Sequence, residues 1–270
     1  MENRSRRRGI VGTALQIDAH RVGIRHRHAS YRSFPQFGTA LATMIVDVII
    51  PAFNEAGAIG LVVQDIADRR VRRVVVVDNG STDATSEVAR EAGATAIREP
   101  RMGYGRACLT GLAHLSADPP DVVAFIDGDR SDYPEEMSAL LDEIERGSDM
   151  VIGSRATGVA ERGSLTPVQV FGNWLSTRLI SRLYGQNFTD LGPFRAITWD
   201  ALQRIDMRDE AFGWTVEMQV KAAKNNLKCS EIPVRYRRRI GVSKVSGTIK
   251  GSVMAGATIL STIARERLRD

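Results

Sequence analysis

The strongest constraint on the fold is a regular alternation of apolar runs and helix-patterned segments that begins at Met44. The run IVDVII at residues 45–50 is apolar enough for a strand that is buried on both faces. Strands are predicted at 45–50, 73–77, 94–98, 122–126 and 150–152, and helices at 56–68, 83–92, 104–116 and 134–146. Strand and helix in turn predict βαβ units, and therefore an α/β fold whose mostly parallel sheet carries helices on both faces.

The rhythm changes after Gly153. The pattern predicts a polar loop at 156–164, a helix at 166–184, a strand at 194–198, a helix at 214–225 and a strand at 228–234. A basic, loop-like segment follows at 235–250. The last helix, at about 249–267, has apolar residues at helical spacing and is predicted to be amphipathic, lying on a membrane surface, against the domain itself or at a dimer contact.

The net charge of +5 is concentrated at the N-terminus. Residues 1–43 contain 8 Arg against Glu2 and Asp18, whereas the remaining residues carry 29 basic and 30 acidic side chains. This segment shows little apolar periodicity, so we expect a disordered basic tail, with Met44 as a possible start of the protein. Binding of nucleic acid or anionic lipid through this tail is the alternative, and it would describe a non-catalytic scaffold protein.

Length and cysteine content narrow the class further. A chain of 270 residues can bury the core of one large domain or two small ones. Cys108 and Cys229 form neither a disulfide framework nor a metal-ligand pattern, which favours a reducing, cytoplasmic compartment. The sequence has no secretory signal and no run of about 18 apolar residues, so we expect no transmembrane helix.

Polar clusters follow three of the predicted strands where those strands end. They read PAFNE from Pro51, DNGSTD from Asp78 and DGD from Asp127. Ligands of open α/β sheets bind at the carboxyl ends of the strands, so these clusters are expected to meet at one edge. Asp127 and Asp129, separated by one glycine, can both face a divalent cation that prefers oxygen ligands and shares them with phosphates. The sequence therefore predicts a site for Mg²⁺ or Mn²⁺ with a diphosphate.

Four stretches, taken together, resemble a known family. VIIPAFNEAGAIG, VVVVDNGSTDAT, FIDGDRSDYPEE and VIGSR, in this order, are similar to family-2 glycosyltransferases of the GT-A fold. Within that family the chain looks most like the polyprenyl-phosphate sugar synthases, the group that includes dolichol-phosphate mannose synthase. The resemblance runs from about residue 44 to 250, which implies a GT-A domain at 44–248 followed by the helix at 249–270.

The resemblance implies roles for individual residues. A nucleotide-sugar donor would be bound by Pro51, Asn54, Glu55, Asp78, Asp127 and Asp129, the last two also holding the metal. Residues near the phosphates or the acceptor would be Arg155, Asp190, Glu217, Arg238 and Lys244. The segment at Arg130 departs from the family's usual Leu-Gln-His-Pro-Pro-Glu, and Gly-Pro after Leu191 stands where relatives often have Ser-Gly. The donor base and sugar therefore stay open.

Structural alternatives exist for several of these residues. Asn54 and Asp190 could be turn residues, and Asp83 a helix cap. Glu217 could pair with Lys221 on a solvated helix face. The basic residues from Arg235 to Lys244 could also form a solvated surface. Gly103-Tyr-Gly-Arg106 lacks the third glycine of a dinucleotide motif and more plausibly begins a helix facing the cleft.

The resulting interpretation is a metal-dependent hexosyltransferase that moves a sugar from a nucleoside diphosphate to an acceptor, with inversion as in most of the family. The basic cluster favours a phosphate acceptor on a polyprenyl lipid, because a phosphate needs no general base. Peripheral contact with the inner face of the membrane would follow. The alternatives are a soluble hydroxyl acceptor, with Asp190 or Glu217 as base, and a nucleotide-sugar pyrophosphorylase or other nucleotidyltransferase. No nucleic acid is expected as a partner.

Overall fold

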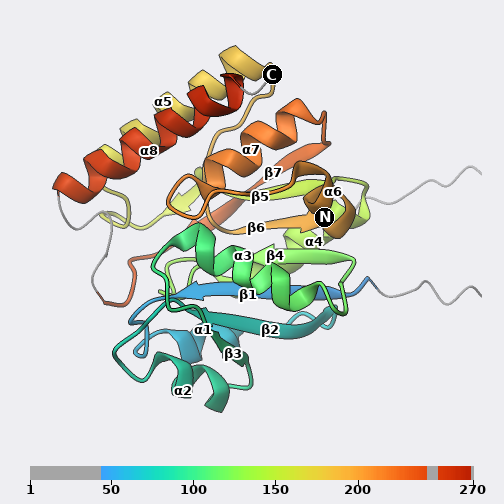
Figure 1. The fold of residues 1–270 in the computed structure, drawn as a ribbon, viewed down its shortest axis with the longest axis vertical. Coiled ribbons are helices and arrows are strands. Elements are labelled where there is room, and N and C mark those ends of the chain that lie inside the picture. Colours follow the sequence, from blue (N-terminus) through green and yellow to red (C-terminus); the bar gives the residue numbers. More distant parts are fainter. Residues whose placement is uncertain (1–43, 242–248, 269–270) are drawn as a thin grey trace, which may run out of the picture. The chain divides into compact units, whose positions relative to one another are not determined.

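The computed structural model describes residues 44–241 and 249–268, which belong to one compact unit of the chain. Its centre is a sheet of seven strands in the order β3-β2-β1-β4-β6-β5-β7 (Figure 1). The strands are β1 (Val46–Ala52), β2 (Val71–Asp78), β3 (Thr95–Arg98), β4 (Val122–Phe125), β5 (Met150–Ala160), β6 (Arg195–Thr198) and β7 (Cys229–Tyr236). β6 runs antiparallel to β4 and β5, and the other pairs are parallel. The predicted α/β fold with a mostly parallel sheet is confirmed.

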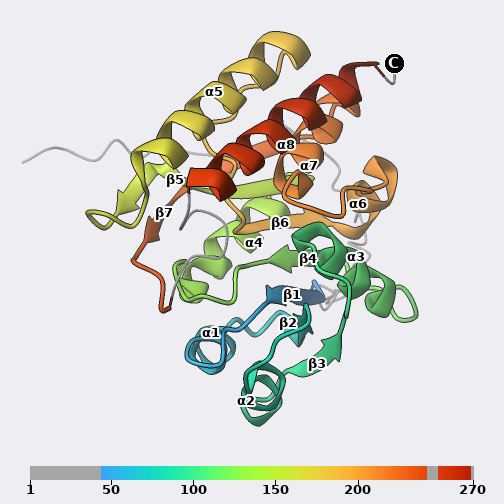
Figure 2. The same ribbon diagram turned by 60° about the vertical axis from the view of Figure 1, so that its left-hand side comes forward.

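Helices cover both faces of this sheet (Figures 1 and 2). They are α1 (Ile59–Asp65), α2 (Thr85–Glu91), α3 (Tyr104–Leu115), η1 (Pro134–Glu136), α4 (Met137–Glu145), α5 (Pro167–Tyr184), α6 (Trp199–Ile205), α7 (Trp214–Lys224) and α8 (Ile249–Leu268). Along β1, Val48 and Ile50 point into a core shared with α1, α2 and α4, whereas Ile49 points into a core shared with α3, α5, α6, α7 and α8. This alternation explains why the strands read as continuous apolar runs.

One prediction of secondary structure is wrong, and one element is missing from the prediction. Residues 156–160 continue β5 instead of starting a loop, because the strand pairs with β7 as far as Ala160 opposite Tyr236. The short helix α6 was not predicted, and it begins where the Thr198 side chain accepts a hydrogen bond from Ala201 N. The strand predicted at 194–198 is present as β6, one residue shorter.

The C-terminal helix packs against the domain. α8 lies beside α5 and α7, and the hydroxyl of Tyr184 on α5 donates to Ile263 O. Ile263 is buried while Leu260 is 42% exposed. The side of α8 that carries Ile263 therefore packs on the domain, which is one of the alternatives that the sequence left open for this helix. No helix in the described part of the chain is long and apolar enough to cross a bilayer.

Candidate active site

The ends of β1, β2 and β4 meet at a pocket of about 430 Å³. The parallel register sets this meeting, because Ala52 at the end of β1 pairs with Asp78 at the end of β2, and Ile49 pairs with Phe125 of β4. The pocket is lined by Pro51, Ala52, Phe53, Glu55, Asn79, Met102, Gly103, Tyr104, Ala107, Asp127, Gly128, Asp129, Ala211, Phe212 and Arg239. The predicted convergence of three polar strand ends at one edge is therefore present.

Two of the predicted donor-binding residues support the pocket from behind instead of lining it. Asn54 has a positive φ of 54°; its Oδ1 accepts a hydrogen bond from Thr82 N at 2.8 Å, and its own N–H donates to Ser81 Oγ at 2.9 Å. Asp78 is buried and accepts from Ser81 N at 2.7 Å and Ser86 Oγ at 2.5 Å. Burial raises the pKa of Asp78, but these hydrogen bonds outweigh it and lower the pKa overall. Both side chains thus fix the loop after β2.

Asp127 and Asp129 lie together at the end of β4. Tyr104 Oη donates to Asp127 Oδ1 at 2.9 Å, and Ser131 donates to Asp129 Oδ1 through its N–H at 2.8 Å and its hydroxyl at 2.6 Å. Burial, and then the neighbouring charge of Asp129, raise the pKa of Asp127 to about 7. Two carboxylates held this close form a site where a cation is favoured.

Arg239 supplies a cation to this site. Its Nη2 lies 2.6 Å from Asp129 Oδ2 and 3.4 Å from Glu55 Oε1. Its Nε has no hydrogen-bond partner within the described residues. Arg239 therefore holds a positive charge beside the two pocket carboxylates.

The two aspartates fit a divalent cation that also binds a ligand. Their oxygens are hard donors of the kind that Mg²⁺ and Mn²⁺ prefer. Within residues 44–241 and 249–268, no group of three or more His, Cys, Asp or Glu side chains is placed to hold a metal by itself. A cation at Asp127 and Asp129 would thus need further ligands such as phosphate oxygens or water.

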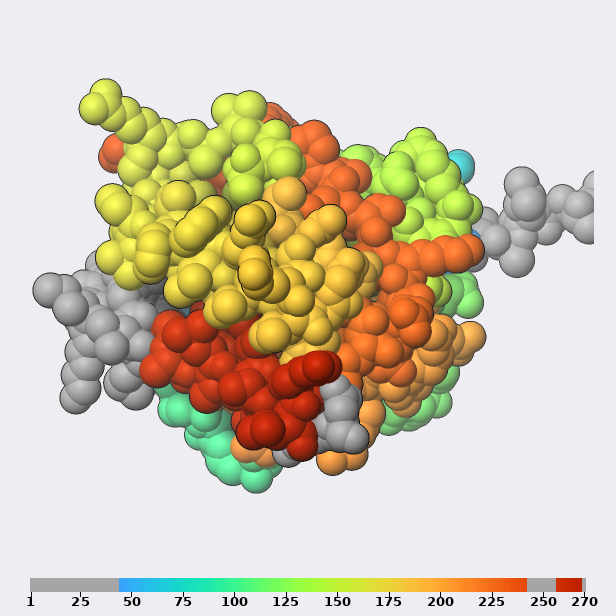
Figure 3. Space-filling model, turned by 90° about the horizontal axis from the view of Figure 1, so that it is seen from above, coloured from blue at the N-terminus to red at the C-terminus, as the bar shows by residue number. Residues whose placement is uncertain are grey.

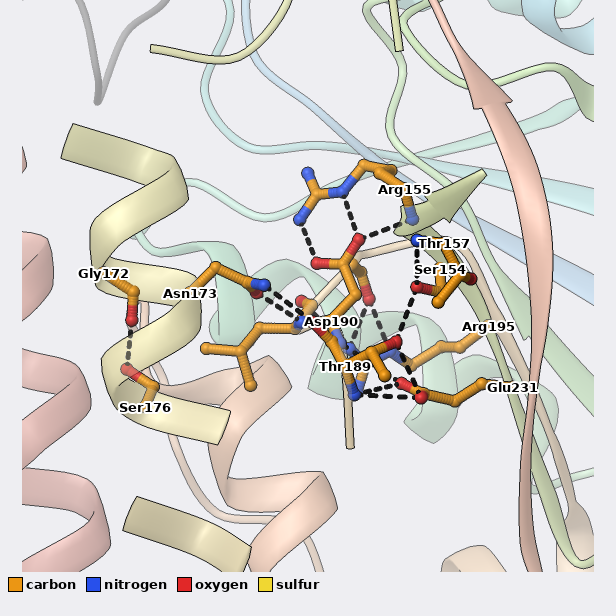
Figure 4. Close-up of polar contacts among 12 residues, drawn as sticks. Ser154, Arg155, Thr157, Gly172, Asn173, Ser176, Thr189, Asp190, Arg195 and Glu231 are labelled. Atoms are coloured by element: carbon orange, nitrogen blue, oxygen red, sulfur yellow. Dashed lines mark hydrogen bonds and ion pairs between the residues drawn. The ribbon is translucent and has the colours of Figure 1, made fainter. Parts of the chain in front are cut away.

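Arg155 and Asp190 form a second polar centre outside the pocket lining (Figure 4). Arg155 donates to Asp190 through Nε at 2.8 Å, Nη2 at 2.6 Å and its backbone N–H at 2.7 Å. Asp190 is 1% exposed. Burial alone would lower the pKa of Arg155, but the pair with Asp190 raises it overall. This bidentate pair fixes the orientation of both side chains.

Hydrogen bonds from two elements hold the segment that carries Asp190. Asn173 on α5 donates to Thr189 O at 2.8 Å and accepts from Leu191 N at 2.8 Å. Glu231 on β7 accepts from Thr189 N and from the Thr189 hydroxyl (Figure 4). The position of Asp190 is therefore fixed from both sides.

Glu217 is fully buried and holds a backbone loop. Its carboxylate accepts from Arg208 N at 3.1 Å and Asp209 N at 2.7 Å, and it pairs with Lys221 Nζ at 2.9 Å. The i,i+4 pair with Lys221 exists, but it lies in the interior and not on a solvated face. Glu217 does not line the pocket, and its effect on the pocket passes through the loop that it holds.

That loop forms one wall of the pocket through Ala211 and Phe212. It is fastened to the start of α3, where Gly105 N donates to Ala211 O at 3.1 Å and Arg106 N donates to Glu210 O at 2.9 Å. A Cβ at Gly105 would collide with the carbonyl oxygen of Asp209. This close approach therefore requires glycine at position 105. Gly105 lies at the start of α3, where the sequence predicted a helix start that faces the cleft.

The basic residues of the predicted phosphate-binding loop divide among different surfaces. Arg239 lines the pocket, whereas Arg238 donates to Arg162 O through Nε at 3.1 Å and Nη2 at 2.8 Å. Arg235 pairs with Glu136 on η1. Lys244 lies outside the described residues. The roles expected for Arg238 and Lys244 stay predictions.

Sequence reasoning did not single out Arg239, Tyr104 or Phe212. Arg239 follows Arg238 directly in a run of basic residues. Only the path of the chain after β7 shows that Arg239 lines the pocket and Arg238 does not. Asp132 was also passed over. It is 1% exposed, and neither carboxylate oxygen has a hydrogen-bond partner within the described residues. Burial, and then the charge of Asp127, raise its pKa well above the ordinary value.

Comparison with known proteins agrees with this arrangement. The family model described as "Glycosyl transferase family 2" matches residues 47–205, a range that includes the ends of β1, β2 and β4. The chain belongs to glycosyltransferase family 2. Its acidic pair, Asp127 and Asp129, lies inside the matched range.

Relatives in this family include enzymes named for lipid-phosphate acceptors. The chain is 34% identical over 225 residues to the dolichyl-phosphate hexose transferase of Haloferax volcanii, covering 82% of this chain and 95% of that protein. It is 29% identical to the undecaprenyl-phosphate mannosyltransferase of Micrococcus luteus, covering 82% and 96%. Glycosyltransferase AglJ of Haloferax volcanii is 32% identical, with 72% of this chain and 63% of AglJ covered. The chain thus spans less than two thirds of AglJ.

Solved structures of other proteins share the fold. Glucosyl-3-phosphoglycerate synthase from Mycobacterium tuberculosis, in complex with Mn²⁺, uridine diphosphate and phosphoglyceric acid, superposes with a TM-score of 0.68 at 20% identity. The superposition covers 84% of this chain and 79% of that one. Together with the sheet order, this likeness confirms the predicted GT-A fold, and the family assignment confirms a glycosyltransferase.

Proposed function

We propose that this glycosyltransferase moves a hexosyl group from a nucleoside-diphosphate sugar to a polyprenyl phosphate. An oxygen of the acceptor phosphate attacks C1 of the sugar, the bond from C1 to the diphosphate breaks, and the nucleoside diphosphate leaves. Attack opposite the leaving group inverts the configuration at C1. The names of the two lipid-phosphate relatives support this choice of acceptor.

The pocket is the proposed donor site. Pro51 and Glu55 form its wall at the end of β1, and Asn79 lies at the end of β2, where a nucleoside fits. Asp127 and Asp129 would hold the divalent cation, which neutralises the negative charge that develops on the leaving diphosphate. Arg239 supplies a second positive charge at the same place, and a guanidinium pairs well with phosphate oxygens.

The choice of a phosphate acceptor rests on one observation: both candidate general bases, Asp190 and Glu217, already have hydrogen-bond partners away from the pocket. Asp190 is held by three hydrogen bonds from Arg155, and Glu217 by two backbone N–H groups and Lys221. Neither carboxylate lines the pocket. A hydroxyl acceptor needs a base within hydrogen-bond reach, whereas a phosphate is already anionic. We assign Arg155, oriented by Asp190, to the acceptor side.

The experiment compares acceptors that differ only in the phosphate. The purified chain, with Mn²⁺ and a panel of labelled nucleoside-diphosphate hexoses, is offered a short polyprenyl phosphate, the matching free polyprenol or a soluble sugar. We expect labelled lipid from the phosphate and none from the polyprenol. Transfer to the soluble sugar alone would contradict the proposal. Release of a nucleotide sugar from sugar-1-phosphate and a nucleoside triphosphate would instead favour the pyrophosphorylase alternative.

A further inference from the structure

One face of α5 leaves large apolar side chains uncovered. Val168, Val170, Phe171 and Trp174 are between 54% and 60% exposed, and the rings of Phe171 and Trp174 lie 5.8 Å apart. The opposite side of the helix is buried in the domain through Ser176, Thr177 and Ile180. Figure 3 looks onto α5 and α8, which lie side by side on this surface. Exposed aromatic side chains grouped in this way mark an interaction surface.

The same face carries positive charge and no negative charge. Arg178 and Arg182 follow Trp174 at intervals of four residues, which places them on one line along the helix, and both are exposed. Between Arg162 and Thr189 the sequence contains no Asp or Glu. An aromatic half followed by an arginine half is the pattern of a helix that lies in a membrane interface and contacts anionic lipid.

We infer that the outer face of α5, defined as Val168, Val170, Phe171, Trp174, Arg178 and Arg182, docks on an anionic lipid bilayer. Phe171 and Trp174 enter the headgroup region, where aromatic side chains are favoured. Arg178 and Arg182 contact lipid phosphates. This inference rests on the proposed function, because a polyprenyl acceptor keeps its hydrocarbon chain in a bilayer.

Charge favours a bilayer over a second copy of the chain. In a two-fold symmetric dimer the same face meets itself, so the contact would gather Arg178 and Arg182 of both copies on a surface to which α5 brings no carboxylate. Anionic lipid neutralises these charges, whereas a symmetric contact concentrates them. The outer face of α5 is therefore suited to a negatively charged surface.

The docking helix is linked directly to the proposed acceptor side of the site. Asn173 extends from α5 to hold Thr189 and Leu191, the neighbours of Asp190, which in turn orients Arg155 (Figure 4). One side chain thus connects a helix on the lipid surface to the ion pair that we assign to the acceptor. This connection gives the outer face of α5 a consequence for catalysis.

The test measures membrane binding without donor or acceptor, so its result does not depend on the identity of the substrates. The full chain is sedimented with vesicles of phosphatidylcholine alone, or mixed with phosphatidylglycerol, at low and high salt. We expect binding to the mixed vesicles that salt weakens. Replacing Phe171 and Trp174 together by Ser should lower the partition coefficient at least about tenfold. Each of Arg178→Gln and Arg182→Gln should lower it about fivefold.

Matched controls separate the outer face of α5 from general effects of surface changes. Leu61→Ser removes a side chain on α1 that is 38% exposed, and Arg146→Gln removes an exposed arginine that caps α4. Neither should change vesicle binding. The fluorescence of Trp174 should shift to shorter wavelength with mixed vesicles, and Trp174→Phe should abolish that shift even if binding persists.

The outcomes distinguish this inference from the proposed function. Transfer to polyprenyl phosphate in detergent, without vesicle binding, would overturn the docking surface and leave the function intact. Vesicle binding that is lost in the Phe171 and Trp174 variant would support docking even if polyprenyl phosphate were not a substrate. A dimer in sedimentation equilibrium that this variant dissociates would overturn docking in favour of a contact between two copies.

Discussion

Replacing Asp127 by Asn should stabilise the metal-free protein at pH 8 while removing its activity. The change keeps the shape of the side chain, and its carbonyl oxygen can still accept the hydrogen bond from Tyr104. It removes one of two negative charges that lie together at the end of β4. The variant therefore measures how much the negative charge of Asp127 lowers the free energy of unfolding when no cation is bound.

The magnitude follows from the pKa of Asp127. This pKa is about 7 in the folded protein, against about 3.9 for an unfolded chain. The folded state binds the proton more tightly, so the free energy of unfolding falls as pH rises from about 4 to about 7. A difference of about three pH units corresponds to about 4 kcal/mol. Because Asp127 lines an open pocket and is only partly buried, we halve this to about 2 kcal/mol.

Thermal unfolding after treatment with EDTA measures this effect. At pH 8 the Tm of Asp127→Asn should exceed that of the wild type by about 4 to 8 °C, and at pH 4 the two should agree. Added Mn²⁺ should raise the Tm of the wild type but not of the variant. Asp200→Asn, which changes an exposed residue at the start of α6, is the control. An equal difference between Asp127→Asn and wild type at both pH values would refute the reasoning.

Three further predictions concern residues around the pocket. Arg239→Gln should lower turnover at least about tenfold, because the leaving diphosphate loses a cation, and Arg238→Gln should have the smaller effect in the same steady-state assay. Asp190→Asn should lower kcat/KM for the acceptor at least about tenfold, because it releases Arg155, and should leave the KM for the donor unchanged. A change in the donor KM alone would contradict the assignment of this ion pair to the acceptor. Glu217→Gln leaves Lys221 buried without its partner and should lower the free energy of unfolding by about 3 kcal/mol in urea, whereas lost turnover at unchanged stability would indicate a catalytic carboxylate.

Local sequence patterns predicted the half of the sheet that forms the pocket. β1, β2 and β4 are buried on both faces, so their apolar runs are continuous and end abruptly at polar residues such as Asp78 and Asp127. Parallel strands bring those ends together whatever the details of the helices between them. This geometry is why the pocket edge could be predicted before the structure was known.

The parts that could not be predicted depend on contacts between distant residues. β5 extends to Ala160 because its partner, β7, lies about 75 residues later in the chain. Glu217 was expected near the site because of the family resemblance, and its buried partners at Arg208 and Asp209 follow from the fold of a loop. The exposure of Phe171 and Trp174 was equally hidden, because apolar residues at helical spacing predict a buried face.

The close contact of α3 with the loop at 209–211 has a consequence for redesign of the enzyme. Gly105 can accept no larger residue without moving Asp209, so the backbone of this pocket wall is fixed by a residue outside the pocket lining. The side chains of Met102 and Phe212, by contrast, project from that fixed backbone and are 62% and 41% exposed. A library of variants aimed at a new donor base should vary Met102 and Phe212 and keep Gly105. Changes at Met102 and Phe212 alter the surface of the pocket wall, whereas a change at Gly105 would displace the wall.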